Sequence, residues 1–384
     1  MDAETRGWLD GPTSWLELSR AALTHNLEGI QRLVGAALIM AVVKANAYGV
    51  GAIGMAQALA AAGVRLFGVA TVAEAVKLRQ AGVAGQIVCL AWFTRSEVPA
   101  LFEHALTPAV FDLEAARLLD AHARAVGQRL PVWVKIDTGL SRLGVPVATA
   151  TDFLRQLLAL PGLQIAGLFS TLTENPGRDP IQAQRLLAVR RAFFALTRPR
   201  PGQNDLPLSL ASSHGIISLP AGYLDIVRPG ILLHGLEPSE RSRLDEGLLA
   251  RADLRPIASW KARVVDVRTV AAGEQIGYGR QPALADPTAL ATLAIGWADG
   301  YPPAMSQGGA VLIAGRRCPV VTVSANCTIV DVSQTRRPAI GDVAVLLGEQ
   351  SAEAISAAEM SHITGSNVYR LLAAVPEGAA RIWR

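Results

Sequence analysis

Lys44 is the residue whose type and position first indicate chemistry. The chain has 384 residues but only four lysines and five tyrosines, so either residue type inside a motif stands out from ordinary surface composition. Lys44 ends an apolar run and opens the segment KANAYGVG. Desolvation at the end of a buried strand lowers a lysine pKa, which would make Lys44 an amine nucleophile or a Schiff-base former. A lysine that caps a strand in solvent is the alternative, but the surrounding glycines, Asn46 and Tyr48 favour the chemical role.

Eight apolar runs rich in β-branched residues predict the strands that would position Lys44. They are residues 38–45, 66–71, 86–92, 107–112, 130–137, 164–171, 206–212 and 225–230. Most are separated by segments with the spacing of amphipathic helices, such as residues 51–62, 72–80, 113–125 and 181–196. Alternating strands and helices of this number predict an α/β fold, a (β/α)8 TIM-type barrel, with the active site at the carboxyl ends of the strands. A doubly wound open sheet is the alternative, because strand count alone does not prove closure.

The pattern of predicted helices and strands changes near residue 250. Helix-like stretches nearly vanish, and alternating runs punctuated by glycine and proline predict antiparallel strands. These runs are residues 262–270, 289–295, 310–313, 320–323 and 342–347. We therefore expect a barrel domain over residues 1–250 and a mainly β domain over residues 251–384.

Composition excludes several classes of protein. Hydrophobic residues make up 51% of the chain, which excludes a disordered protein, and no apolar stretch is long enough to predict a transmembrane helix. The N-terminus has no apolar core of a secretory signal, and Cys89, Cys318 and Cys327 have no CxxC spacing, so we expect a cytoplasmic protein. Six scattered histidines predict no metal site. The net charge is +4, but dispersed arginines and 5% aromatic residues do not form a nucleic-acid-binding pattern.

The motif around Lys44 resembles the pyridoxal-phosphate lysine motif of the alanine racemase family. Five further segments resemble motifs of that family in family order: VKIDTGLSRLG (134–144), DIVRPGILLHGLEP (225–238), EQIGYG (274–279), IGWADGYP (295–302) and VYRLL (368–372). The resemblance covers almost the whole chain. It implies a fold-type III pyridoxal-phosphate barrel followed by a β domain, and a racemase for L- and D-alanine or a related, possibly bulkier amino acid.

The resemblance also implies how protons would move. Lys44 would bind pyridoxal 5'-phosphate and, once displaced by the substrate amine, act as acid or base on one face of the substrate α-carbon. Tyr278 would act on the opposite face, with Arg142 nearby to bind the substrate carboxylate together with the amide of Ala325. In the family this tyrosine comes from the partner subunit, which implies a head-to-tail homodimer.

Other positions match residues that hold the cofactor in the family. The phosphate would be bound by Tyr48, Ser213, Gly230, Ile231 and Tyr369. Ser213 and Gly230 also follow the seventh and eighth predicted strands, where barrels commonly bind phosphate. Arg228 would face the pyridine nitrogen, and because a guanidinium can only donate, that nitrogen would stay unprotonated. Lys135 matches a lysine that is often carbamylated in the family.

Several positions depart from the family pattern. Histidines are expected where Thr171 and Ser209 stand, and a Met-Asp pair where Ala325 and Asn326 stand. Arginines are expected at Thr322 and Pro303, a tyrosine at Trp297 and a histidine at Val50. Because these changes cluster around the substrate and its access channel, we expect a substrate bulkier than alanine, or a different reaction on the same cofactor.

Two other functions stay open at this stage. One is a specialised epimerase, lyase or decarboxylase on the same fold. The presence of both Lys44 and Tyr278 favours racemisation over these, because a lyase needs no pair of opposed proton donors. The other is a non-enzymatic protein of cofactor homeostasis, but such single-barrel proteins lack a C-terminal β domain.

Overall fold

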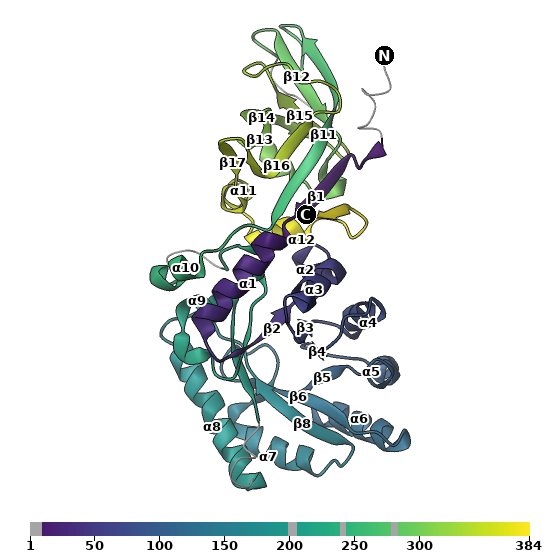
Figure 1. The fold of residues 1–384 in the computed structure, drawn as a ribbon, viewed down its shortest axis with the longest axis vertical. Coiled ribbons are helices and arrows are strands. Elements are labelled where there is room, and N and C mark those ends of the chain that lie inside the picture. The colour runs from purple at the N-terminus through teal and green to yellow at the C-terminus, as the bar shows by residue number, and fades with distance from the viewer. Residues whose placement is uncertain (1–9, 199–205, 239–242, 278–282) are drawn as a thin grey trace. The chain divides into compact units, whose positions relative to one another are not determined.

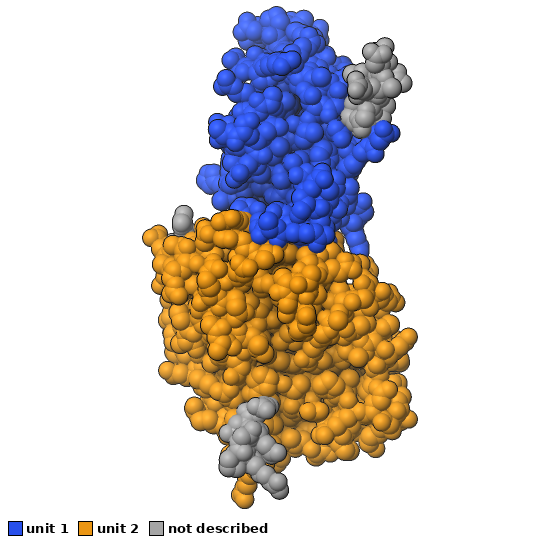
Figure 2. Space-filling view, in the orientation of Figure 1, with its two compact units in different colours: residues 1–22, 48–51, 256–384 blue, residues 23–47, 52–255 orange. Residues whose placement is uncertain are grey.

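The computed structural model describes residues 10–198, 206–238, 243–277 and 283–384. It divides into two compact units (Figure 2): unit 1 holds residues 1–22, 48–51 and 256–384, and unit 2 holds residues 23–47 and 52–255. Within the described ranges, no helix combines the length and hydropathy needed to cross a membrane.

Unit 2 is a closed barrel of eight parallel strands surrounded by helices (Figure 1). The pairing of β5 with β6 joins the two ends of the strand order and excludes the open doubly wound sheet. The barrel strands are β2 (Leu38–Val42), β3 (Leu66–Val69), β4 (Gln86–Cys89), β5 (Thr107–Val110), β6 (Leu130–Asp137), β8 (Leu163–Phe169), β9 (Leu208–Ser212) and β10 (Ile226–Arg228). The short strand β7 (Val145–Pro146) pairs with the end of β6. The predicted fold class is confirmed.

Helices follow most of the barrel strands, and their apolar faces are buried. The α-helices of unit 2 are most of α1 (Arg20–Val34), then α3 (Ala52–Ala61), α4 (Val72–Gln80), α5 (Val98–Glu103), α6 (Leu113–Ala125), α7 (Val147–Leu158), α8 (Asp179–Thr197), α9 (Ser213–Ser218) and α10 (Glu246–Ala252). A buried core cluster combines Met40, Val88, Ala109, Trp133, Phe169 and Ile226 from six of the barrel strands. Trp133 of β6 and Phe169 of the neighbouring β8 are in edge contact, with 6.3 Å between ring centroids. Gly167 leaves the room that Trp133 needs, since a Cβ there would lie 2.9 Å from its ring.

Unit 1 is built on a mainly antiparallel sheet. Pairing of β11 with both β12 and β16 closes β11, β12, β15, β14, β13 and β16 into a ring. The strands are β1 (Ser14–Leu18), β11 (Ala258–Val270), β12 (Thr288–Leu293), β13 (Ala310–Ile313), β14 (Arg316–Val323), β15 (Thr328–Asp331), β16 (Val343–Gln350), β17 (Glu353–Ile355) and β18 (Ala380–Trp383). Two helices, α11 (Ala357–Thr364) and α12 (Val368–Ala373), precede the last strand.

The units do not follow the chain in the simple order expected for residues 1–250 and 251–384. The N-terminal strand β1 pairs with β11 and β18, so the first described residues lie in unit 1, and the division falls in the first turn of α1 (Arg20–Val34). The reason is long-range pairing: the strand-forming pattern of β1 does not indicate which sheet completes it.

Candidate functional site

Lys44 stands just beyond the carboxyl end of β2, at the start of a left-handed turn. This turn is marked α2 (Lys44–Tyr48) in Figure 1, and its residues 45–48 all have φ between 50° and 54°. The expected strand over residues 38–45 therefore ends earlier, at Val42. A left-handed conformation costs a non-glycine residue roughly 1–2 kcal/mol, so four in succession persist only if the surroundings hold them.

Side chains from neighbouring segments of unit 2 hold this turn. Glu74 of α4 accepts hydrogen bonds from the backbone amides of Ala45 at 2.5 Å and of Ala70 at 2.8 Å. Asn46 accepts one from the amide of Ala52 at 2.9 Å through its side-chain oxygen. Glu74 also completes a capping box at the start of α4, so the same carboxylate anchors a helix and the turn that follows Lys44.

His234 ties the turn to the segment after β10. This side chain is buried, with Nε2 2.9 Å from the carbonyl oxygen of Ala47 and Nδ1 3.1 Å from that of Gly230. Burial lowers the His234 pKa, while the two carbonyl contacts oppose that effect. His234 thus spans two segments that the sequence motifs assign to the cofactor.

Four cationic side chains gather at the carboxyl end of the barrel: Lys44, Lys135, Arg142 and Arg228. We call them the barrel-mouth cluster. Desolvation lowers the pKa of Lys44, and the charges of Arg142 and Arg228 lower it further, whereas Glu74 raises it. The Lys44 residue is exposed to solvent, but protein partly surrounds its ammonium, and this partial burial is what lowers the pKa. The Lys135 pKa falls to about 8, mainly through burial and then through the same two arginines.

Arg228, like Lys135, is a buried member of the barrel-mouth cluster, and each residue is 5% exposed. Its guanidinium donates to the hydroxyl of Ser209 at 2.6 Å and to the carbonyl oxygen of Ser170, and burial lowers its pKa to about 10. The ring of Phe169 lies 5.4 Å from the guanidinium carbon and 5.2 Å from the Lys135 ammonium. Ser209 therefore serves as a neutral hydrogen-bond acceptor for Arg228, at a position where the resemblance expects histidine.

Ser213 and Gly230 lie together at the carboxyl ends of the seventh and eighth barrel strands. The Ser213 hydroxyl accepts hydrogen bonds from the amides of Gly230 at 2.9 Å and Leu232 at 3.4 Å, and Ile231 opens a short 3₁₀ helix (Ile231–His234). A hydroxyl and successive backbone amides at helix starts form a donor set that suits a phosphate group. With the lowered pKa of Lys44 and the donor-only Arg228, these residues of unit 2 fit pyridoxal phosphate.

Tyr48 and Tyr369 are in contact within unit 1, with ring centroids 5.7 Å apart and planes tilted by 54°. The adjacent Gly49 has φ +92°, and a Cβ there would lie 1.8 Å from the carbonyl oxygen of Leu372 in α12. Arg381 donates to the carbonyl oxygen of Gly49 at 2.7 and 3.0 Å. Two tyrosines expected to bind phosphate are thus brought together from distant parts of the sequence.

The segments expected to contact the substrate are also joined within unit 1. The carbonyl oxygen of Ala325 accepts from the amide of Ala298 at 2.9 Å, and Gly296 is needed because a Cβ would lie 2.3 Å from that same oxygen. Thr322 lies beside Gly277, at 3.2 Å from a Cβ built there. Tyr278 follows Gly277 but lies outside the described residues.

Sequence reasoning assigned no role to Glu74 or His234. The Thr71–Glu74 spacing of a capping box was the available signal for Glu74. For His234 the only signal was its place inside the segment DIVRPGILLHGLEP, because the contact with Ala47 spans 187 positions of the sequence.

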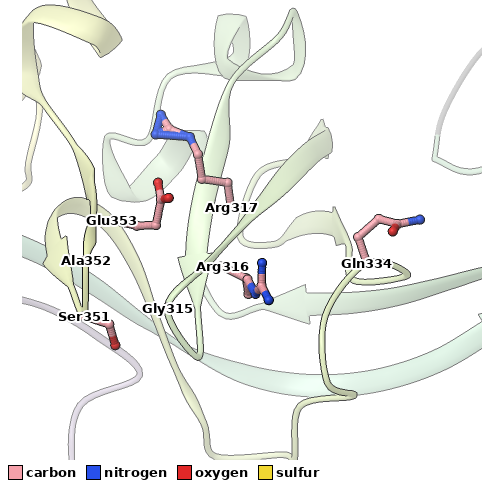
Figure 3. A pocket seen from close by; sticks show the side chains of 7 residues that line it. All are labelled: Gly315, Arg316, Arg317, Gln334, Ser351, Ala352 and Glu353. Carbon is pink, nitrogen blue, oxygen red and sulfur yellow. The ribbon is translucent and has the colours of Figure 1, made fainter.

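A separate surface pocket lies on unit 1, between the turns around β13–β14 and β16–β17 (Figure 3). Its volume is about 380 Å³, and its walls are formed by Gly315, Arg316, Arg317, Gln334, Ser351, Ala352 and Glu353. Arg317 is already paired with Glu359, outside the lining. None of the residues expected to bind cofactor or substrate lines this pocket, so the barrel-mouth cluster is the better candidate site.

Two family models match the chain and together cover most of it. Residues 18–238 match the alanine racemase N-terminal domain, and residues 257–383 match the alanine racemase C-terminal domain. An alanine racemase of Syntrophobacter fumaroxidans is 35% identical over 364 residues, covering 94% of this chain and 95% of the relative. One of Symbiobacterium thermophilum is 34% identical over 382 residues, covering 98% of each.

Solved structures of alanine racemases have the same fold as this chain. The alanine racemase of a D-cycloserine-producing Streptomyces lavendulae has a TM-score of 0.85 and 28% identity, with 97% of this chain and 98% of that chain covered. That of Bartonella henselae, with covalently bound pyridoxal phosphate, has a TM-score of 0.81 and 25% identity, with 97% and 100% covered. By sequence over nearly its full length and by fold, the chain belongs to the alanine racemase family.

Proposed function

We propose that this protein is a pyridoxal-phosphate-dependent alanine racemase, an isomerase that interconverts L- and D-alanine. The observation that carries the proposal is the barrel-mouth cluster, in which Lys44 has a lowered pKa at the carboxyl end of the barrel. A positively charged site at this place suits a ligand with phosphate and carboxylate groups. Family membership supplies the second support.

Within this proposal, Lys44 binds the cofactor and exchanges a proton with one face of the substrate α-carbon. When bound, pyridoxal phosphate supplies an electron sink that acidifies the α-hydrogen of an attached amino acid. The lowered pKa of Lys44 leaves a larger neutral fraction of its amine, which is the form able to accept the proton. Ser213, Gly230 and Ile231 would hold the phosphate, and Tyr48 and Tyr369 are further candidate ligands for it.

Arg228 and Arg142 have different roles. Arg228 would face the pyridine nitrogen of the cofactor, and because a guanidinium has only hydrogen-bond donors, that nitrogen would stay unprotonated. An unprotonated ring would withdraw electrons only weakly, so this arginine would favour return of the proton to the α-carbon over transamination. Arg142 binds the substrate carboxylate together with the amide of Ala325.

The second proton donor is Tyr278, which we assign to the opposite face of the α-carbon. We place it in the active site of the partner subunit of a head-to-tail homodimer. The support is its position in the segment EQIGYG, within the part of the chain that matches the C-terminal domain of the family. A phenol is weakly acidic, so this role needs a neighbouring cation, and Arg142 is the candidate.

Lys135 is the proposed site of carbamylation. The neutral amine would attack carbon dioxide, forming an N–C bond and releasing a proton to solvent. Burial beside Arg142 and Arg228 supports this, since the lowered pKa of about 8 supplies neutral amine and the carbamate would replace a third cation by an anion.

The small side chain of Ala325 suggests a wider range of amino-acid substrates. Its side chain is a single methyl group at a position where the resemblance expects methionine, so we expect larger amino acids to be accepted beside alanine. Rates for alanine and for a panel of larger amino acids, measured side by side, test this. Turnover of alanine alone would refute the wider range and leave the racemase assignment intact.

The decisive experiment combines cofactor binding with isotope exchange. The purified protein should be yellow with pyridoxal phosphate and should interconvert L- and D-alanine, whereas the Lys44→Ala variant should be colourless. A Tyr278→Phe variant should lose α-deuterium exchange for one enantiomer only. A wild-type protein that takes up no cofactor would refute the assignment.

Products of the same assay test the alternative reactions. Cofactor-bound protein that releases carbon dioxide or an aldehyde without racemising would instead indicate a decarboxylase or lyase.

We also propose a cytoplasmic location, supported by three cysteines that form no disulfide.

A further inference from the structure

Gln182 is a buried amide whose polar atoms are all engaged by two loops at the mouth of the barrel. Only 1% of the residue is exposed. Its Nε2 donates to the hydroxyl of Thr138 at 3.0 Å and to the carbonyl oxygen of Thr171 at 3.1 Å, and its Oε1 accepts from the amide of Thr173 at 2.9 Å. One side chain of α8 therefore joins the loop after β6 to the loop after β8.

The Thr138 hydroxyl extends this connection to Arg228. Thr138 and Ser170 share a hydrogen bond between their hydroxyls at 2.7 Å, and both residues are buried. The carbonyl oxygen of Ser170 accepts from the Arg228 guanidinium, whose other end donates to Ser209 at 2.6 Å. Only neutral groups lie between Gln182 and the arginine.

The same end of α8 also holds the loop that carries Arg142. Arg185 donates to the carbonyl oxygen of Thr138 at 2.8 Å, and Arg178 donates to that of Gly139 at 2.9 Å. Within the loop, the Asp137 carboxylate accepts from the amides of Gly139 at 2.9 Å and Ser141 at 3.0 Å. Thr138, the residue that Gln182 contacts, thus lies four positions before Arg142.

We propose that Gln182 is a positioning residue that fixes Arg228 and the Arg142 loop relative to each other. The inference rests on the proposed function, in which these two arginines meet the cofactor and the substrate. An amide suits the place because it donates to a carbonyl and a hydroxyl while accepting from a backbone amide. A carboxylate cannot donate to the oxygen of Thr171. It would also stand near Asp179, which accepts from the same Thr173 amide at 3.1 Å.

The Gln182→Glu variant of the loaded enzyme tests the proposal through its pH profile. At low pH the protonated carboxyl can donate to Thr171, so activity should approach that of the wild type. As pH rises and the carboxylate forms beside Asp179, kcat should fall by roughly tenfold relative to the wild type at the same pH, through displacement of the positioned groups. Gln184→Glu makes the same chemical change at an exposed position of α8 and should follow the wild-type profile.

Hydrogen exchange in the same variants gives a readout independent of catalysis. Gln182→Met, which removes all three bonds, should speed amide exchange in residues 137–144 and 171–174, as should Gln182→Glu at high pH but not at low pH. Wild-type exchange rates together with a wild-type pH profile would overturn the proposal. Faster exchange in both loops of a protein that does not racemise alanine would instead refute the proposed function and uphold the structural role of Gln182.

Discussion

Lys135 offers a test of how the barrel-mouth cluster is balanced, through the Lys135→Met variant. Methionine is close in shape to the aliphatic part of the lysine side chain but brings no charge into a site shared with Arg142, Arg228 and Lys44. The pKa of Lys135 falls from 10.5 to about 8 in the folded protein. Since one pKa unit corresponds to about 1.4 kcal/mol, the protonated lysine destabilises the native state by ~3 kcal/mol.

The expected gain in the variant is smaller than this figure. The ammonium lies 5.2 Å from the ring of Phe169, and this favourable contact is lost with the charge. We expect the free energy of unfolding of cofactor-free Lys135→Met to exceed that of the wild type by on the order of 1–3 kcal/mol at pH 7. Urea unfolding in buffer free of carbon dioxide measures it.

The pH dependence has a defined sign. Between pH 8 and 10.5 the unfolded chain keeps the Lys135 proton that the native state has released, so wild-type stability rises with pH in this window. The advantage of the variant should therefore be full below pH 8 and vanish near pH 10.5. The exposed Lys77→Met serves as the control and should show no such trend.

Bicarbonate separates the ammonium from the carbamate at Lys135. Addition near pH 8 should stabilise the wild type and leave Lys135→Met unchanged, because only the wild type has an amine at position 135. Equal stabilities at pH 7, or parallel pH curves for wild type and variant, would refute the charge argument. An identical response to bicarbonate would refute carbamylation alone.

Three further predictions follow from the site. His234→Leu removes both carbonyl contacts and should weaken cofactor affinity by roughly tenfold in a fluorescence titration, with partial recovery in His234→Gln; unchanged affinity would exclude a role in shaping the site. Inactive Lys44→Ala and Tyr278→Phe proteins, unfolded and refolded together, should regain activity, because one site of each hybrid dimer would be intact; a mixture without activity contradicts the shared site. Gly49→Ala should lower the free energy of unfolding by several kcal/mol, well beyond the loss in Gly63→Ala. Gly63 has a similar positive φ of +97°, but a Cβ there would meet no atom within 4 Å, so equal losses would disprove the close approach of α12.

The sequence was sufficient for the elements that follow from local pattern. The helices predicted over residues 72–80 and 113–125 have those bounds in the structure, because their periodicity is reinforced by the caps Thr71 and Asp112. Counting the predicted strands placed Ser213 after the seventh and Gly230 at the end of the eighth. In the structure the Gly230 amide donates a hydrogen bond to the Ser213 hydroxyl. Periodicity, caps and turn residues are properties of a few adjacent positions, so they can be read without knowing the fold.

Tertiary structure alone decided what depends on distant partners. Closure of the barrel required β5 to pair with β6, and the assignment of β1 to the β unit required β11, more than two hundred positions away. The left-handed turn after Lys44 exists because Glu74 and His234 hold it, and nothing in KANAYG specifies those contacts. A sequence pattern indicates which side chains are buried or reactive, whereas hydrogen-bond geometry and shared burial arise only when the chain brings those side chains together.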